Sequence, residues 1–176
     1  MTHSLDLALH HVGGRGGSRR FPVLPSFEGD MVNVLYDGDP DCLDGMAAAS
    51  DRLASRTIAL ADCIGQAAGP AFLRLYRDCG ASSLLAFRED YKSRFLALGS
   101  EVIDHQASAF DTIRSVPVQL ATLDQVLARP GAAVPPPDFL SLNTQGSELQ
   151  IMLGAGRTLR EHALVLQAEV SLFEIY

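Results

Sequence analysis

Residues 5–17 read LDLALHHVGGRGG, an apolar run that ends in a loop with four glycines. This pattern is typical of a buried strand that enters a tight loop. Residues 31–40, MVNVLYDGDP, form a second such unit, in which a β-branched and apolar run stops at a turn-forming cluster. The Ala-, Leu- and Met-rich residues 41–54 then predict a helix, and residues 56–60 predict a third strand. Successive strand–helix–strand units indicate a parallel sheet, so we expect an α/β fold.

The middle of the chain, residues 66–137, breaks this alternation and predicts an antiparallel insertion. Strand-like runs at residues 72–76 and 116–120 flank a polar stretch. Thr122 and Gln125 have the spacing of a capping box, so a short helix should begin there.

The last part of the chain predicts a return to the parallel sheet. After a proline-rich linker, we expect a strand at residues 139–142 and a helix over residues 147–160. The apolar run over residues 163–173 is typical of a strand covered on both faces. The whole chain, residues 1–176, is expected to form a single domain.

The composition places the chain among globular proteins. Its 176 residues leave room for one domain with a hydrophobic core, and 47% of them are hydrophobic. The net charge of −7 disfavours a nucleic acid partner, because phosphate backbones are also negative. No apolar run approaches the roughly 18 residues that a membrane span needs, and the first residues lack the pattern of a leader. We therefore expect a cytoplasmic protein without a membrane partner.

The first glycine loop and Asp37 together predict a nucleoside site. Gly13 and Gly16 allow a ligand to lie directly against the backbone, because no side chain intervenes. A strict dinucleotide-binding pattern fails, since Arg19 stands where its last glycine is needed. Asp37 follows the loop at the separation of about 20 residues that is expected for a carboxylate on the ribose hydroxyls. An ordinary glycine-rich turn is the alternative interpretation of the loop.

Other polar residues follow the neighbouring strands. Asp62 ends the third strand, where it is either a contact for an adenine amino group or a turn former. Asn143 and Gln145 end the fourth strand, close to where ligands of such sheets bind, although Asn143 is equally suited to an Asx turn. The five histidines do not have the spacing of a metal site, and no metal is expected.

Seven segments, taken in order, resemble the FkbM-type methyltransferases. They are residues 12–17 (VGGRGG), 36–40 (YDGDP), 59–62 (ALAD), 82–85 (SSLL), 122–124 (TLD), 140–149 (LSLNTQGSEL) and 167–171 (QAEVS). The resemblance implies an S-adenosylmethionine-dependent O-methyltransferase with a Rossmann-like class I sheet, acting on a hydroxyl group of a small molecule or sugar.

The resemblance also implies roles for single residues. The methionine part of the cofactor would lie on the glycine loop formed by Gly13, Gly14 and Gly16. Asp37 would bind the ribose, and Asp62 would lie near the adenine. Asn143 and Gln145 would lie near the sulfonium and the acceptor.

Two departures from the family leave an alternative function open. His11 and Asn143 stand where the family commonly has acids, which favours a catalytically inactive relative or a partner subunit. The family's sheet continues through two more strands beyond the fifth, so we expect either a fragment or a smaller sheet. An exposed sheet edge would favour a homo-oligomer.

Overall fold

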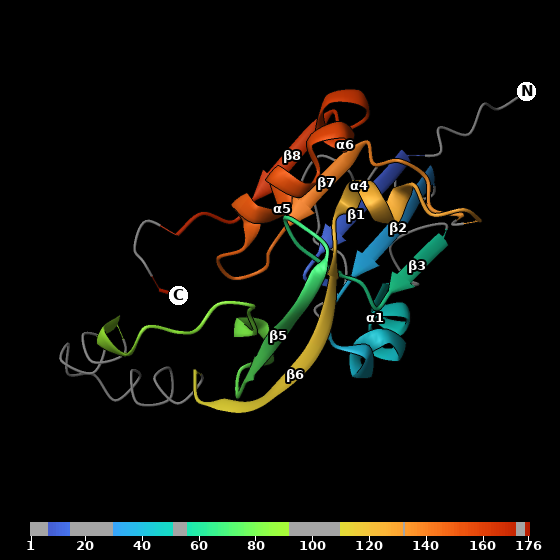
Figure 1. The fold of residues 1–176 in the computed structure, drawn as a ribbon. Coiled ribbons are helices and arrows are strands. Elements are labelled where there is room, and N and C mark those ends of the chain that lie inside the picture. Colours follow the sequence, from blue (N-terminus) through green and yellow to red (C-terminus); the bar gives the residue numbers. More distant parts are fainter. Residues whose placement is uncertain (1–6, 15–29, 51–55, 92–109, 132, 172–174) are drawn as a thin grey trace, which may run out of the picture.

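The larger sheet of the protein is parallel and has five strands (Figure 1). The computed structural model describes residues 7–14, 30–50, 56–91, 110–131, 133–171 and 175–176. In spatial order the strands are β3 (Arg56–Leu60), β2 (Met31–Tyr36), β1 (Leu7–Val12), β7 (Phe139–Leu142) and β8 (Val165–Ala168). The order reverses at β1, which has β2 on one side and β7 on the other, and ligands of open α/β sheets bind at such a switch point. The expected α/β class and parallel sheet are confirmed.

The central strands are buried because helices cover them. One face packs against α4 (Leu123–Leu127), α5 (Glu148–Gly154) and α6 (Gly156–Glu161), through a core that includes Val12, Val34, Tyr36, Leu140 and Leu142. On the other face, Met46 of α1 (Leu43–Ser50) is fully buried close to Leu35. All six residues of β2 are buried, as expected for a strand in a parallel sheet.

The helices begin largely where the sequence predicts. Thr122 and Gln125 form the capping box at the start of α4, each side chain bonding the backbone of the other residue. The single helix expected over residues 147–160 is instead two, α5 and α6. Gly154 ends α5 in close contact with the loop after β4 (Cys63–Ile64). Glycine is needed there, because a Cβ at this position would lie 2.3 Å from the carbonyl oxygen of Gly65.

The insertion forms a second, smaller sheet. Its antiparallel pair is β5 (Gly69–Tyr76) with β6 (Thr112–Ala121), and β4 lies parallel to β6 on the other side. The pair extends away from the larger sheet, and the short helix η4 (Cys79–Ala81) follows β5 (Figure 1). The predicted antiparallel insertion is therefore confirmed.

The expectation for the last strand is partly wrong. β8 spans only Val165–Ala168, and Val165 and Leu166 are 43% and 41% exposed instead of covered on both faces. The reason is that β8 is the edge strand of the described sheet, with β7 as its neighbour.

Candidate functional site

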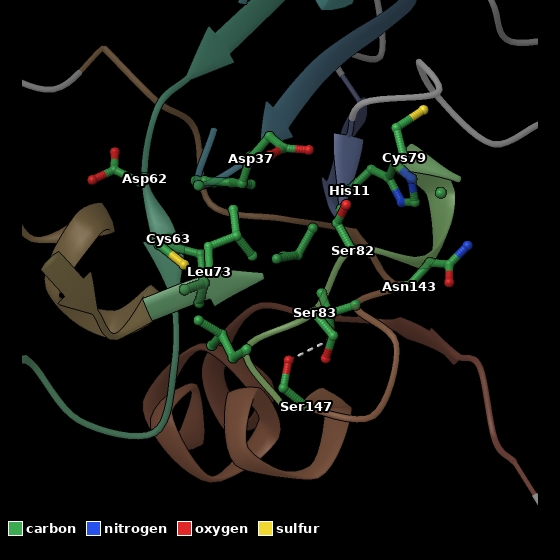
Figure 2. A pocket seen from close by; sticks show the side chains of 18 residues that line it. His11, Asp37, Asp62, Cys63, Leu73, Cys79, Ser82, Ser83, Asn143 and Ser147 are labelled. Atoms are coloured by element: carbon green, nitrogen blue, oxygen red, sulfur yellow. Dashed lines mark hydrogen bonds between the residues drawn. The ribbon is translucent and has the colours of Figure 1, made fainter. Parts of the chain in front are cut away.

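A cavity of about 300 Å³ lies at the carboxyl ends of β1, β2 and β7 (Figure 2). The parallel sheet supplies one wall, which includes Gly13, Asp37 and Asn143. The insertion supplies the facing wall, through Leu73 of β5 and the segment from Cys79 to Leu84. The cavity thus brings together residues that are far apart in the sequence, and we refer to it as the first cavity.

Gly13 joins the ends of three strands. Its backbone N–H donates to the carbonyl of Tyr36 at 3.0 Å, and its φ of +91° lies in the left-handed region. A Cβ at this position would lie 2.0 Å from the carbonyl oxygen of Asn143, which no side chain can tolerate. The glycine is therefore needed for the close approach of β1 and β7 and leaves bare backbone at the cavity.

The other predicted glycines have different positions. Gly14 is buried, and a Cβ there would meet Leu35 and Met46 at 3.0 Å, so it packs towards α1 and does not line the first cavity. Gly16 lies outside the described residues.

Asp37 lies at the first cavity with its backbone fixed. Its N–H donates to the carbonyl of Leu60 at 3.1 Å, and its carboxylate accepts from the N–H of Asp39 at 2.9 Å. The residue is only half-buried, so its carboxylate can accept further hydrogen bonds from a ligand. This places a hydrogen-bond acceptor beside the bare backbone of Gly13.

Asp62 has a partner that the sequence did not reveal. Both carboxylate oxygens accept from the guanidinium group of Arg129, at 2.9 and 2.6 Å. Asp62 lies at the rim of the first cavity, and its carboxylate points away from the centre (Figure 2). A place for Asp62 near an adenine stays a prediction.

Cys63 follows Asp62 and gives the first cavity an apolar wall. The thiol is buried, and burial, together with the nearby Asp37 and Asp62, raises its pKa to about 12. It is therefore a neutral thiol at physiological pH, not a nucleophile. No sequence motif marked this residue.

His11 and Asn143, where the family commonly has acids, both line the first cavity. His11 is 2% exposed, and its Nδ1 lies 3.0 Å from the hydroxyl of Ser141 on the adjacent strand. The side-chain oxygen of Asn143 accepts from Nε2 of Gln145 at 2.8 Å. The hydrogen bonds of both side chains thus involve other residues of the sheet edge.

Gln145 lies in the turn after β7, two residues beyond Asn143. It does not line the first cavity but a second cavity of about 660 Å³, together with Tyr176 and Glu169. Its φ of +57° is unusual for a residue other than glycine and costs of the order of 1 kcal/mol or more. The predicted pair Asn143 and Gln145 therefore faces two different cavities.

Little in the sequence indicated the residues that the insertion contributes to the first cavity. Ser82 and Ser83 line the first cavity, and the buried hydroxyl of Ser83 donates to the carbonyl of Gln145 at 2.7 Å. The only signal was their place among the family-like segments, because their role depends on the insertion folding back over the sheet. Within the described part of the chain, no group of three His, Cys, Asp or Glu residues is suited to a metal ion.

Comparison with known protein families identifies a domain. The model of the methyltransferase FkbM domain matches residues 40–176. Comparisons with curated proteins and with solved structures give no match. In the described residues, no helix is both long and apolar enough to span a bilayer. The single domain over residues 1–176, the cytoplasmic location and the homo-oligomer stay predictions.

Proposed function

Since the chain belongs to the FkbM methyltransferase family, we propose that it transfers the methyl group of S-adenosylmethionine to a hydroxyl group of a small molecule. The observation that carries this proposal is the pairing of Gly13 and Asp37 at the switch point of the parallel sheet. Both residues precede the matched range, so they support the proposal independently of the match.

The residues of the first cavity fit such a cofactor. A half-buried carboxylate such as that of Asp37 accepts two hydrogen bonds from the diol of a ribose. Bare backbone at Gly13 allows a ligand to lie against the end of β1. The neutral thiol of Cys63 and the side chain of Leu73 offer apolar contacts for a flat ring.

When bound, S-adenosylmethionine supplies a methyl group on a positively charged sulfur, and transfer requires the acceptor oxygen, the methyl carbon and the sulfur to lie in line. The contribution of the protein is therefore mainly to position the two reactants. Asn143, held by Gln145, borders the side of the first cavity that is closest to the second cavity. We propose that Asn143 and Gln145 hold the reacting groups in place.

Calorimetric titration with S-adenosylhomocysteine tests the proposal. We expect saturable binding, and a ligand at 100 times its Kd should raise the free energy of unfolding by about 2.7 kcal/mol. Asp37→Ala should weaken binding by about 10- to 100-fold, because hydrogen bonds to a charged group are lost.

Asp44→Ala is the matched control for this experiment. Asp44 is an exposed carboxylate in the first turn of α1 and does not line the first cavity, so affinity should stay within about 2-fold of the wild type. The proposal fails if S-adenosylhomocysteine produces neither heat nor a thermal shift. Equal affinities of the Asp37 and Asp44 variants would contradict the role of Asp37 alone.

A further inference from the structure

We infer that Tyr176 is a positioning residue of the first cavity, and that it acts through Gln145 on Asn143, which binds the carboxylate of the amino-acid part of the cofactor. The inference rests on the proposed function and deepens it. It assigns a binding partner to one more part of the ligand, and it adds a residue that does not itself line the first cavity.

Tyr176 connects the two walls of the first cavity. Its hydroxyl lies 3.0 Å from the carbonyl oxygen of Ala81 in η4 and 3.2 Å from Oε1 of Gln145 in the turn after β7. Burial raises the pKa of this phenol, so the hydroxyl keeps its proton and shares it between the two acceptors. Because Cys79 and Asn143 line the cavity on these two sides, one side chain joins the insertion to the parallel sheet at this place.

The insertion determines where the ring of Tyr176 lies. The centroid of this ring is 5.9 Å from that of Phe87 and 6.5 Å from that of Tyr76. The adjacent backbone is also fixed, because the N–H of Arg88 donates to the carbonyl of Ile175 at 2.9 Å. The hydroxyl of Tyr176 therefore reaches Gln145 from a fixed base.

Gln145 has a strained backbone that these contacts maintain. Its φ of +57° is rare for a residue other than glycine, and such conformations persist only where the surrounding structure determines them. The hydroxyl of Ser83 donates to its backbone carbonyl at 2.7 Å, and Tyr176 bonds its side chain. Both the backbone and the side chain of Gln145 are thus held by other segments.

The hydrogen bonds of Gln145 determine which way two side-chain amides face. A carboxylate can only accept, so Nε2 of Gln145 is the atom that faces Glu169, at 3.3 Å, and Oε1 faces Tyr176. Nε2 also donates to Oδ1 of Asn143 at 2.8 Å. Figure 2 shows the nitrogen and the oxygen of Asn143 pointing in different directions. Since the oxygen is bound on the side of the turn, Nδ2 is the atom that can donate to a ligand in the first cavity.

An N–H donor at this place suits one part of the cofactor. It attracts an anion and is unfavourable beside a sulfonium or an ammonium group, so the carboxylate is the matching charged group. Asp37 follows β2 and Asn143 follows β7, on opposite sides of β1. A ligand whose ribose is bound by Asp37 would therefore cross the bare backbone of Gly13 and extend its amino-acid part towards Asn143. Holding this part also fixes the position of the sulfur that carries the methyl group.

Two ligands that differ only in this carboxylate test the inference. They are S-adenosylhomocysteine and its decarboxylated analogue, in which a hydrogen atom replaces the carboxylate. The wild-type chain should bind S-adenosylhomocysteine about 10-fold more tightly in calorimetry, because the analogue lacks a hydrogen bond to a charged group. Asn143→Asp keeps the oxygen that Gln145 binds but replaces the N–H₂ group with a second oxygen. In this variant the preference for the carboxylate should vanish or reverse.

Two tyrosine variants test the positioning role with the same chemical change. Tyr176→Phe keeps the ring but removes the hydroxyl that holds Gln145, and should reduce the preference for S-adenosylhomocysteine about 3- to 10-fold. Tyr76→Phe is the control, because its hydroxyl bonds the backbone of Leu85 and Phe87, which do not line the first cavity. The preference should stay within about 2-fold of that of the wild type. Urea denaturation checks that both variants fold, and the comparison of the two ligands in the wild type needs no variant.

The outcomes separate this inference from the proposed function. The inference alone is overturned if S-adenosylhomocysteine binds the wild-type chain without any preference over the analogue, or if Asn143→Asp keeps the preference. Equal changes in the Tyr176 and Tyr76 variants also overturn it, because the hydroxyl of Tyr176 would then have only a structural role. A failure of S-adenosylhomocysteine to bind the wild-type chain contradicts the proposed function, and the inference with it.

Discussion

The parallel sheet and the insertion form the two walls of the first cavity, but they are held in place by different interactions. The central strands of the parallel sheet are buried on both faces, and β1, β2 and β7 are joined by continuous backbone hydrogen bonds. Most of β6 is exposed, but Leu73, Leu75 and Tyr76 of β5 are buried, and polar side chains also link the insertion to the rest of the chain. The sheet therefore sets the position of Gly13 and Asp37, and the buried side chains of β5 together with a few polar contacts set the position of the facing wall.

The polar contacts of the insertion differ greatly in burial. Arg114 of β6 pairs with Asp41 at 2.9 Å, but the side chains are 51% and 70% exposed. Such a pair contributes at most about 1 kcal/mol. The hydroxyl of Ser83 is buried and bonds the turn after β7. We therefore expect Ser83, more than the exposed ion pair, to keep the two walls together.

The largest effect should come from Gly13→Ala, within the parallel sheet. The new Cβ would lie 2.0 Å from the carbonyl oxygen of Asn143, at a φ of +91°. Overpacking and backbone strain together should lower the free energy of unfolding by about 4 kcal/mol. Urea denaturation measures this change.

Gly131→Ala separates strain from overpacking. Gly131 also has a positive φ, of +78°, but a Cβ there would contact nothing within 4 Å. Its substitution should cost only about 1–2 kcal/mol. If both variants lost the same stability, the close approach of β1 and β7 would not be the reason for glycine at residue 13.

The second effect concerns a buried histidine of the parallel sheet. His10 is fully buried, with Nε2 against the carbonyl of Pro135 and Nδ1 against the hydroxyl of Tyr36, each at 2.9 Å. Burial lowers the pKa of His10 to about 4, and the hydrogen bond to Pro135 only partly opposes this. In the unfolded chain the pKa returns to about 6.5.

The sign of the resulting pH dependence follows from proton binding. Between pH 6.5 and pH 4 the unfolded chain binds a proton at His10 that the folded protein does not bind. Stability from this residue is therefore complete above pH 6.5 and is lost as the pH falls towards 4, by about 3 kcal/mol in total.

Urea denaturation of the wild type and of His10→Gln between pH 7.5 and pH 4.5 measures this contribution. The carboxylates titrate in both proteins, so their contributions cancel in the difference between the two free energies of unfolding. The free energy of unfolding should therefore depend less on pH in His10→Gln than in the wild type. Parallel profiles would show that His10 does not cause the loss.

The parallel sheet could be predicted from the sequence because its signals are local. β2, β3 and β7 have the predicted boundaries, since each is an apolar run bounded by turn-forming residues. Once the strands are parallel, topology alone brings their carboxyl ends together. The shared position of Gly13, Asp37 and Asn143 at one cavity is consistent with this reasoning.

The rest of the site depends on contacts between distant segments, which leave no local pattern. Nothing near Asp62 indicates its ion pair with Arg129, which is 67 residues away. Gln145 has a positive φ, which glycine adopts more readily than glutamine does, so the sequence does not indicate this turn conformation. Ser83 enters the first cavity only because the insertion folds back over the sheet.

The smallest of these effects should come from Ser83→Ala, at the contact between the two walls. The hydroxyl donates to the carbonyl of Gln145 at 2.7 Å and accepts from the N–H of Leu85 at 3.0 Å. Its removal leaves both groups without this partner in a buried place, so the free energy of unfolding should fall by about 2 kcal/mol. Ser115→Ala, at an exposed position of β6, is the control and should change it by less than about 0.5 kcal/mol.

The same variant distinguishes the two walls by their binding properties. Ser83 fixes the turn between the two cavities, whereas Asp37 and Gly13 belong to the sheet. Ser83→Ala should therefore weaken binding of S-adenosylhomocysteine by only a few-fold, less than Asp37→Ala does. If Ser83→Ala weakens S-adenosylhomocysteine binding as much as Asp37→Ala does, the insertion fixes the cofactor side of the site, and the parallel sheet alone does not position the cofactor.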